Sequence, residues 1–245
     1  MVPPHHHGDF NMIHWAMEPA ADGTVRPRTL GLAEDASILK MRYGPQPVEG
    51  PFGSAMHFDG KGAYAETKYR GIEGKQPRTV AFWVKVPRDF NSKEGFAMVS
   101  WGKFPDEIPG GVWQISINPI EADGPLGRLR LGVMGGNAIG TTDLRNDRWH
   151  HIAVVLYPVA NPDLGQHVLF FIDGAVETVS YRTLGKIDTE VASADHGVWL
   201  GRDITSTAGA ERYFRGGIDE VYIFDAALSE PEIRALMERN ETPGR

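Results

Sequence analysis

The chain has 245 residues, 41% of them hydrophobic, with 32 acidic and 25 basic side chains and no cysteine. A net charge of −7 without a basic run does not favour nucleic acid as a partner, and the lack of cysteine excludes disulfides and cysteine-ligated zinc. The longest apolar runs are strand-sized, such as 151–157, and fall short of the roughly 18 residues of a transmembrane helix, so no membrane insertion is expected.

The first ten residues do not have the charged start and apolar core of a signal peptide. We expect residues 1–10 to be a disordered lead or the remnant of an expression tag, which is also the favoured interpretation of His5, His6 and His7 over a metal site. Residues 11–240 are predicted to form a single domain, with 241–245 as a tail. Within that domain, 11–17 is compatible with a strand, whereas 24–53 is rich in proline, glycine and charge and predicts a long loop.

After residue 53, short alternating runs separated by glycine and proline predict about a dozen strands. The main runs are 55–60, 63–69, 78–86, 95–102, 111–119, 127–136, 148–158, 167–181, 197–202 and 216–225. In the run 78–86, Val80, Phe82, Val84 and Val86 share one face, and Ala81, Trp83 and Lys85 share the other. The runs 148–158 and 167–181 are more continuously apolar, which predicts strands covered on both faces. This pattern predicts an all-β fold, a two-sheet antiparallel β-sandwich.

Two local signals are strong. Asp173–Gly174 predicts a hairpin turn. Ser229 and Glu232 form a capping box with Pro231 in the first turn, and Ile233, Leu236 and Met237 follow at helical spacing. The sequence therefore predicts one short C-terminal helix, which we expect to pack over the end of the sandwich.

Five segments in order carry a family resemblance: GSAMHFDGKGAYAET, RTVAFWVKVP, DRWHHIAVVLYP, VLFFIDGAVE and FRGGIDEVYIFDAALSEPEIRAL. Together, over about Gly53–Met237, they resemble the concanavalin A-like lectin/glucanase superfamily, and more narrowly the bacterial laminin-G-like (LamG-type) jelly-roll modules. The resemblance implies two curved antiparallel sheets with a concave face that often binds carbohydrate. It also implies a structural calcium ion at the edge where the last strand meets the first strands.

The implied calcium ligands are Asp219, in the IDE motif, and Asp59 with Gly60, in the FDG motif, since calcium prefers carboxylate and carbonyl oxygens. Lys61 departs from the pattern, because many relatives carry an acid or Asn at about this place. Alternation along a strand predicts that Asp219 faces inward, as a cation ligand or a hydrogen-bonded anchor, and that Glu220 faces outward. A structural Asp219 paired with Arg215 is the alternative.

Polar and aromatic residues on alternating faces are candidates for a sugar site, which combines a stacking ring with hydrogen-bonding groups. We expect Trp83, Gln114, Asn118 and Arg130 to contribute to it. The alternative is an ordinary solvated sheet face, with Trp83 in the core. The other tryptophans are expected in the core: Trp15, Trp101, Trp113, Trp149 and Trp199. His150 and His151 point to opposite faces of a strand and are expected to be structural.

The sequence gives no support for catalysis. Retaining glucanases of the superfamily place acids as E-x-D-x-E on one strand, so that all face the cleft, and no such run occurs here. Asp188 and Glu190 alternate but have no third acid. The favoured function is a non-catalytic binding module for carbohydrate or a protein surface, stabilised by structural calcium. The alternatives are a divergent polysaccharide hydrolase or lyase, and a purely protein–protein interaction module.

The resemblance also implies a setting. Such modules are usually attached to exported proteins, so we expect an extracytoplasmic location, as part of a longer chain. A glycan or protein ligand is expected, and a monomer is favoured.

Overall fold

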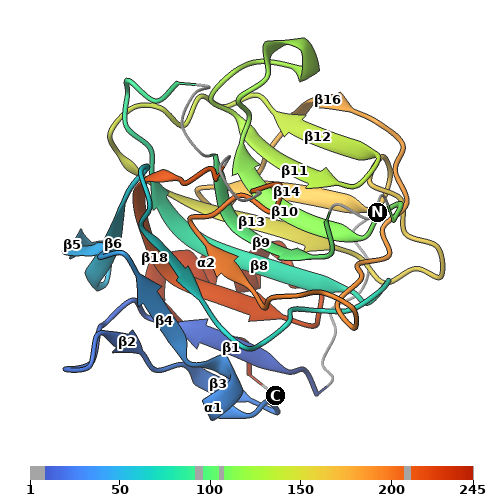
Figure 1. Cartoon of the computed structure of the whole chain (residues 1–245). Helices are drawn as coiled ribbons and strands as arrows, with labels where there is room; N and C mark the ends of the chain where they lie inside the picture. Colours follow the sequence, from blue (N-terminus) through green and yellow to red (C-terminus); the bar gives the residue numbers. More distant parts are fainter. Residues whose placement is uncertain (1–8, 92–95, 105–107, 207–210, 245) are drawn as a thin grey trace.

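The computed structural model describes residues 9–91, 96–104, 108–206 and 211–244, so the predicted lead, with His5–His7, lies mostly outside the described residues (Figure 1). Two nine-stranded antiparallel sheets, sheet A and sheet B, enclose one main core. The prediction of an all-β sandwich with a short C-terminal helix is confirmed. None of the helices in the described ranges is long and apolar enough to cross a membrane.

Sheet A follows the order β15-β14-β13-β8-β18-β1-β3, while β6 also pairs with β18 and β5 pairs with β6. Its strands are β1 (Met12–Trp15), β3 (Arg28–Leu30), β5 (Gln46–Gly50), β6 (Gly53–Asp59), β8 (Arg78–Lys85), β13 (Trp149–Leu156), β14 (Val168–Ile172), β15 (Ala175–Val176) and β18 (Arg215–Phe224).

Sheet B follows the order β16-β12-β11-β10-β9-β17-β7-β4-β2. Its strands are β2 (Thr24–Val25), β4 (Leu39–Arg42), β7 (Tyr64–Glu66), β9 (Ala97–Gly102), β10 (Val112–Ile117), β11 (Leu129–Val133), β12 (Gly136–Gly140), β16 (Val179–Arg182) and β17 (Trp199–Leu200). The helices are α1 (Glu34–Ser37), a 3-10 turn η1 (Glu121–Asp123) and α2 (Glu230–Arg239).

Strand alternation explains the core. On β8, Val80, Phe82 and Val84 are fully buried between the sheets, as predicted, while Ala81 joins a second apolar cluster on the other side of sheet A. That outer cluster also contains Ile233 and Leu236 of α2. The helix therefore packs on the outer face of sheet A rather than over the end of the sandwich. The prediction that β13 and β14 are covered on both faces is confirmed.

The two local signals form as predicted. Asp173 and Gly174 both have positive φ values, 50° and 77°, and connect β14 to β15 in a tight turn. At the start of α2, the backbone N–H of Ser229 donates to the Glu232 carboxylate over 2.7 Å. This contact is half of the predicted capping box, so the sequence correctly located the helix start.

The segment 24–53 is not a loop, and this prediction was wrong. It contains the short strands β2, β3, β4 and β5, which lie at or near sheet edges, and the one-turn helix α1. Edge strands such as β5, with four exposed residues, carry no apolar alternation from which to predict them. The predicted lead 1–10 also ends too late, because the Phe10 ring packs edge-on against Phe224 at 5.6 Å.

Strand β18 lies inside sheet A, with β8 along one edge and two strands, β6 and β1, sharing the other edge. Residues 215–218 pair with β6, whereas residues 221–224 pair with β1. Between the two stretches the pairing with β8 is shifted by a bulge, and Glu220 has a φ of +47°. The two adjacent acids of the IDE motif thus occupy the point where β1 and β6 diverge.

Candidate functional site

The outer face of sheet B carries the candidate ligand pocket. On β10, Trp113, Ile115 and Ile117 point into the core, and Gln114 lies on the opposite face. A cavity of about 280 Å³ opens on this outer face over β9, β10 and β11. Most of its walls are apolar, formed by Phe96, Phe104, Val112, Ile120, Val133, Met134 and Ile204, and Gln114, Arg130, Thr205 and Arg212 supply its polar groups.

Gln114 fixes one wall of this pocket. Its side-chain oxygen accepts a hydrogen bond of 2.7 Å from the backbone N–H of Ile204, which ties the segment after β17 to the sheet. The Asp203 carboxylate stabilises the same segment by accepting hydrogen bonds from the backbone N–H and hydroxyl of Thr205, at 2.8 and 2.6 Å. The wall is therefore preorganised.

Arg130 is the more buried of the two charged residues that line the pocket, since Arg212 is exposed. Its Nη2 atom lies 3.0 Å from Asp123 Oδ2, and its side chain is only 15% exposed. Burial lowers the pKa of the Arg130 guanidinium, and Asp123 acts in the opposite direction. The guanidinium still has donors that the Asp123 contact does not use, since a guanidinium carries five N–H groups.

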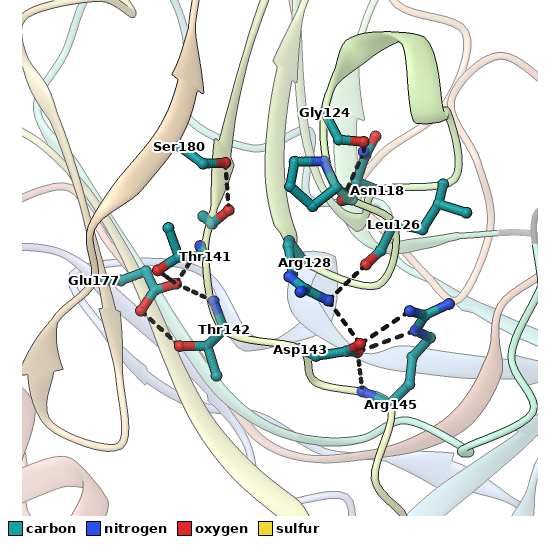
Figure 2. A network of polar contacts seen from close by, with 12 residues as sticks. Asn118, Gly124, Leu126, Arg128, Thr141, Thr142, Asp143, Arg145, Glu177 and Ser180 are labelled. Carbon is teal, nitrogen blue, oxygen red and sulfur yellow. Dashed lines mark hydrogen bonds and ion pairs between the residues drawn. The ribbon is translucent and has the colours of Figure 1, made fainter.

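Asn118 does not join Gln114 and Arg130, although all three were predicted together. It is 1% exposed, and its side-chain amide donates to the carbonyl oxygens of Ile120, Gly124 and Pro125 at 2.9–3.1 Å. Figure 2 shows this anchor beside a second network, in which Asp143 holds Arg128 and Arg145. Asn118 shapes the loop after β10 and has no free group to offer a ligand.

Trp83 belongs to the other side of the molecule, which neither sequence interpretation anticipated. It faces outward from sheet A, opposite His151, with ring centroids 5.3 Å apart. It is half-buried, with Phe52 against it at 6.4 Å. Burial lowers the pKa of His151 to about 4, so its imidazole is neutral at pH 7. His150 instead pairs with Asp173 at 2.7 Å, so both histidines are structural, as expected.

A cluster of aromatic rings and arginine on sheet B was missed by the sequence analysis. Trp199 does not enter the core but faces outward, where His196 stacks on it and the Arg202 guanidinium lies 4.2 Å from its ring centre. Arg202 also lies 4.9 Å from the ring centre of Tyr64, a cation–π arrangement. A cavity of about 600 Å³ lies beside this cluster, with Glu66 and His196 in its lining. The sequence signal was the alternation of Trp199 with Leu200, which enters the core.

Asp219 is fully buried, but on the outer face of sheet A, since it lies opposite Trp83 rather than in the core. Its Oδ1 atom accepts the backbone N–H of Glu220 at 2.8 Å. Its Oδ2 atom has no partner of good hydrogen-bond geometry, although the backbone N–H of Phe52 lies close enough to lower the pKa of the carboxyl. Burial, with Glu220 adding to it, raises the pKa of Asp219 to about 7. A buried oxygen in this state requires a proton or a cation.

Glu220 does not face the solvent, so that prediction was wrong. It is 3% exposed and its carboxylate contacts the His14 imidazole, which stacks on Tyr222 at 3.9 Å. The bulge with its positive φ breaks the strand alternation, and it places Asp219 and Glu220 on the same face. The assumption that adjacent residues must face opposite ways fails here for that reason.

The predicted calcium ligands do not come together. Asp59 pairs with Arg215, four residues from Asp219 along β18, which corresponds to about 13 Å. The Asp59 carboxylate accepts the backbone N–H groups of Lys61, Gly62 and Ala63 and so closes its own turn. Within the described ranges there is no cluster of three or more histidine or acidic side chains that could hold a metal. Arg215 contacts Asp89 at 3.0 Å, so the predicted alternative partner of Asp219 is engaged elsewhere.

Asp188 and Glu190, the two acids at alternate positions, both form contacts within the protein. Asp188 pairs with Lys186 at 2.8 Å, and the Glu190 carboxylate accepts the backbone N–H of Ser193 at 2.9 Å. Neither lines the pocket over β10.

Solved structures with this architecture include domain 4 of AbnA, a GH43 extracellular arabinanase from Geobacillus stearothermophilus, in complex with arabinotriose. It is 18% identical with a TM-score of 0.60, and the match covers 94% of this chain and 100% of that one. The binding domain of Paraclostridial Mosquitocidal Protein 1 is 16% identical, with a TM-score of 0.62 and coverage of 95% and 52%. The binding domain of botulinum neurotoxin DC, in complex with rat synaptotagmin II, is 10% identical, with a TM-score of 0.55 and coverage of 94% and 52%.

This chain thus spans all of the arabinanase domain and about half of the toxin chains. At these identities the similarity shows a shared fold. No curated protein matches the sequence. A family model, however, matches residues 59–234, well over half of the chain. The chain therefore belongs to the concanavalin A-like lectin/glucanases superfamily.

Proposed function

We propose that this chain is a non-catalytic binding module whose ligand site is the pocket over β9, β10 and β11 on sheet B. The observation that carries this proposal is the lining: mostly apolar walls with Gln114 and Arg130 directed into one cavity of about 280 Å³. Ligand sites in proteins typically combine an apolar surface with a few fixed polar groups. The hydrogen bond from Ile204 to Gln114 keeps that geometry in place before any ligand arrives.

Carbohydrate is the proposed ligand. Sugar hydroxyls accept from guanidinium and amide N–H groups, and the apolar faces of sugar rings pack on aromatic side chains such as Phe96 and Phe104, which line the pocket. The arabinanase domain of the same fold, seen with arabinotriose, supports this choice. The toxin domain seen with synaptotagmin II makes a protein ligand the second candidate.

Catalysis has weaker support. A retaining glycosidase needs two carboxyls about 5–5.5 Å apart at the scissile bond. Asp123 pairs with Arg130 beside the pocket, and the described lining contains no carboxylate. The mosquitocidal-protein and neurotoxin domains that share the fold are binding domains. The module is therefore proposed to hold its ligand without transforming it.

A calcium ion at Asp219 remains part of the proposal, with a changed ligand set. The unpartnered Oδ2 atom of Asp219 fits a cation, and a Cβ at Gly50 would collide with it, so only glycine leaves this space. Glu18 is the proposed second carboxylate, because its Oε1 atom accepts the N–H of Ser54 at 2.7 Å, in the turn whose Gly50 faces Asp219. Carbonyl oxygens of the turn and water would complete the shell. Asp59 and Gly60 are not part of it.

Thermal unfolding with chelator and then added calcium tests this ion. A cation that binds only the folded state raises the melting temperature by mass action. Asp219→Ala should abolish the increase, and Asp59→Ala should leave it intact. An equal response in the wild type and in Asp219→Ala would contradict the site.

We further propose that the module works outside the cytoplasm as part of a longer chain. The arabinanase whose domain shares the fold is described as extracellular, which supports this setting. Localisation of the full-length protein by fractionation of its native cells tests this part of the proposal.

The ligand site is tested by calorimetry with arabinotriose and a panel of neutral oligosaccharides. We expect Arg130→Ala to weaken binding about tenfold or more, as removal of a charged hydrogen-bonding group in a buried site typically does. Arg128→Ala is the matched control, since Arg128 is also ion-paired on sheet B, to Asp143, but does not line the pocket. Equal affinities for both variants and the wild type would contradict the proposed pocket.

A further inference from the structure

A second pocket lies on the opposite side of the molecule, at one end of the outer face of sheet A. Its volume is about 240 Å³. Its lining combines the strands β5, β6, β8, β13 and β18: Val48, Glu49, His57, Lys85, Pro87, Asp147, Trp149, Gly216 and Gly217. None of these residues belongs to the pocket on sheet B or to the Asp219 site.

Strand register explains how the pocket forms. His57, Gly217, Lys85 and Trp149 are consecutive partners across β6, β18, β8 and β13, so they form one row across the sheet. All four face outward, because their neighbours Phe58, Ile218 and Val84 enter the core. Gly217 leaves a gap in this row.

The gap is filled by the indole ring of Trp149. A Cβ at Gly217 would lie 2.6 Å from Cη2 of Trp149, so the ring rests directly on the glycine backbone. Trp149 was expected in the core but is half-buried on this outer surface. A flat aromatic ring supported from below by backbone has the character of a stacking platform.

Polar groups of both signs surround this ring and are not satisfied by the protein. The side chains of Lys85, Glu49 and His57 have no hydrogen bond or ion pair with any of the residues that the structure describes, although the charge of Lys85 acts on His57. Burial, and then the charge of Arg215, lower the pKa of His57, so its imidazole offers one donor and one acceptor at neutral pH. Asp147 is partly engaged, because it accepts the backbone N–H of Arg88 at 3.1 Å and its Oδ2 atom lies 3.5 Å from Nε of the same arginine, but a carboxylate keeps further acceptor capacity.

We propose that this pocket is a second carbohydrate site, which takes a single neutral sugar unit stacked on Trp149. Each sugar hydroxyl both donates and accepts, and the pocket offers acceptors in Glu49 and Asp147 and donors in Lys85 and the indole N–H. The mixture of one ammonium and two carboxylates does not favour a strongly charged ligand of either sign. The volume is below the roughly 300–1,000 Å³ of pockets for drug-sized ligands, which suits one ring rather than an oligosaccharide.

This second site goes beyond the proposed function and does not depend on it. The two pockets open on the outer faces of opposite sheets, so one glycan strand lying on sheet B does not reach the pocket on sheet A. A chain with both sites holds two separate strands and gains avidity for a glycan network.

The test is an NMR titration of the full chain, in which the indole N–H resonance of Trp149 reports on the pocket. The probes are methyl glycosides of arabinose, xylose, glucose and galactose. We expect at least one probe to shift the Trp149 signal saturably, and Lys85→Ala to weaken that binding about tenfold. Trp149→Phe and Trp149→Ala lack the indole, so the backbone N–H resonances of Gly217 and Lys85, which line the same pocket, report on binding to these variants. Trp149→Phe should keep part of the affinity because a ring remains, whereas Trp149→Ala should abolish it.

Arg130→Ala separates the two sites. If the second site exists, this variant leaves the Trp149 response unchanged even when binding on sheet B is lost. The proposal is overturned if no probe shifts the Trp149 resonance. It is also overturned if the response disappears in Arg130→Ala while Lys85→Ala leaves it unchanged, since the effect would then originate on sheet B.

Discussion

The outer faces of sheets A and B differ in what covers them. On sheet A, Ala81 and Ala153 alternate with core residues, and α2 packs against them through Ile233 and Leu236. On sheet B the outward positions mix polar side chains such as Gln114 and Arg130 with the Trp199 ring, and two cavities open there. The sandwich core is shared, so these alternating positions alone decide whether a face is closed by the protein or left for a ligand.

Part of the outer face of sheet A is polar. Sheet A is not apolar throughout: its outer face carries Asp219, the Glu220–His14 pair and the row containing Trp149. These polar groups lie beyond the part contacted by α2. Sheet A therefore has a closed apolar half and a polar half, and the bulge on β18 marks the change between them.

The largest expected effect comes from the closed half. Phe224 is fully buried, against Phe10 and Tyr222. Phe224→Ala should lower the free energy of unfolding by about 3–5 kcal/mol, through the lost burial and the cavity left behind. Ile120→Ala is the counterpart on the open face, since Ile120 is 43% exposed, and its effect should stay within about 0.5 kcal/mol. Urea unfolding of both variants measures the two changes in the free energy of unfolding. Similar changes would contradict the difference between a closed and an open face.

The next effect concerns the buried acid Asp219 and depends on pH. Its folded-state pKa is raised to about 7, so in chelator its stabilising contribution is complete below the ordinary value of 3.8 and is lost as pH rises through 7. Asp219→Asn should therefore gain stability relative to the wild type between pH 5 and pH 8, by at most about 3 kcal/mol, since about two pH units of this range lie below the folded pKa. Urea unfolding at both pH values measures this gain.

The stability of Asp219→Asn must be compared with that of the wild type at each pH, because the titration of His151 changes the stability of the wild type in the opposite direction. Its pKa is lowered to about 4, so its contribution is complete above 6.5 and is lost as pH falls through 4. The two groups partly cancel in the wild-type profile. A difference between Asp219→Asn and wild type that does not change with pH would show that Asp219 is not protonated in this range.

The smallest effect tests the independence of the two faces. Ser229→Ala removes a hydroxyl that contacts the Glu232 carboxylate at 2.7 Å and should cost about 1 kcal/mol of stability. The affinity of the sheet B pocket for its ligand should not change. Scanning calorimetry measures the stability of this variant, and titration calorimetry measures its affinity. A loss of affinity would mean that helix packing on sheet A controls the opposite face.

Much of this architecture could be predicted from the sequence, where strand period and burial agree. Val80, Phe82 and Val84 alternate into the core, and Ser229 starts the helix. The segment 24–53 could not be predicted as strands, because edge strands such as β5 are held by backbone pairing and leave no apolar pattern.

The sites were harder to predict than the fold, for a geometric reason. Gln114 and Arg130 could be predicted to face the same way because both sit on regular paired strands, and the structure places them in one pocket. The prediction that Asn118 binds a ligand did not foresee that its side-chain amide donates to carbonyl oxygens of the following loop. Glu220 was misjudged because a bulge is not visible in strand periodicity, and Trp149 because only the neighbouring Gly217 makes room for its ring outside the core.

The central claim is that a glycan binds the pocket on the outer face of sheet B. A crystal structure of the chain with the tightest-binding oligosaccharide of the calorimetry panel tests it most directly. We predict a sugar within hydrogen-bond distance of Arg130 and Gln114, with Phe96 or Phe104 against a ring. A crystal in which sugar occupies other surfaces and leaves this pocket to water would contradict the account.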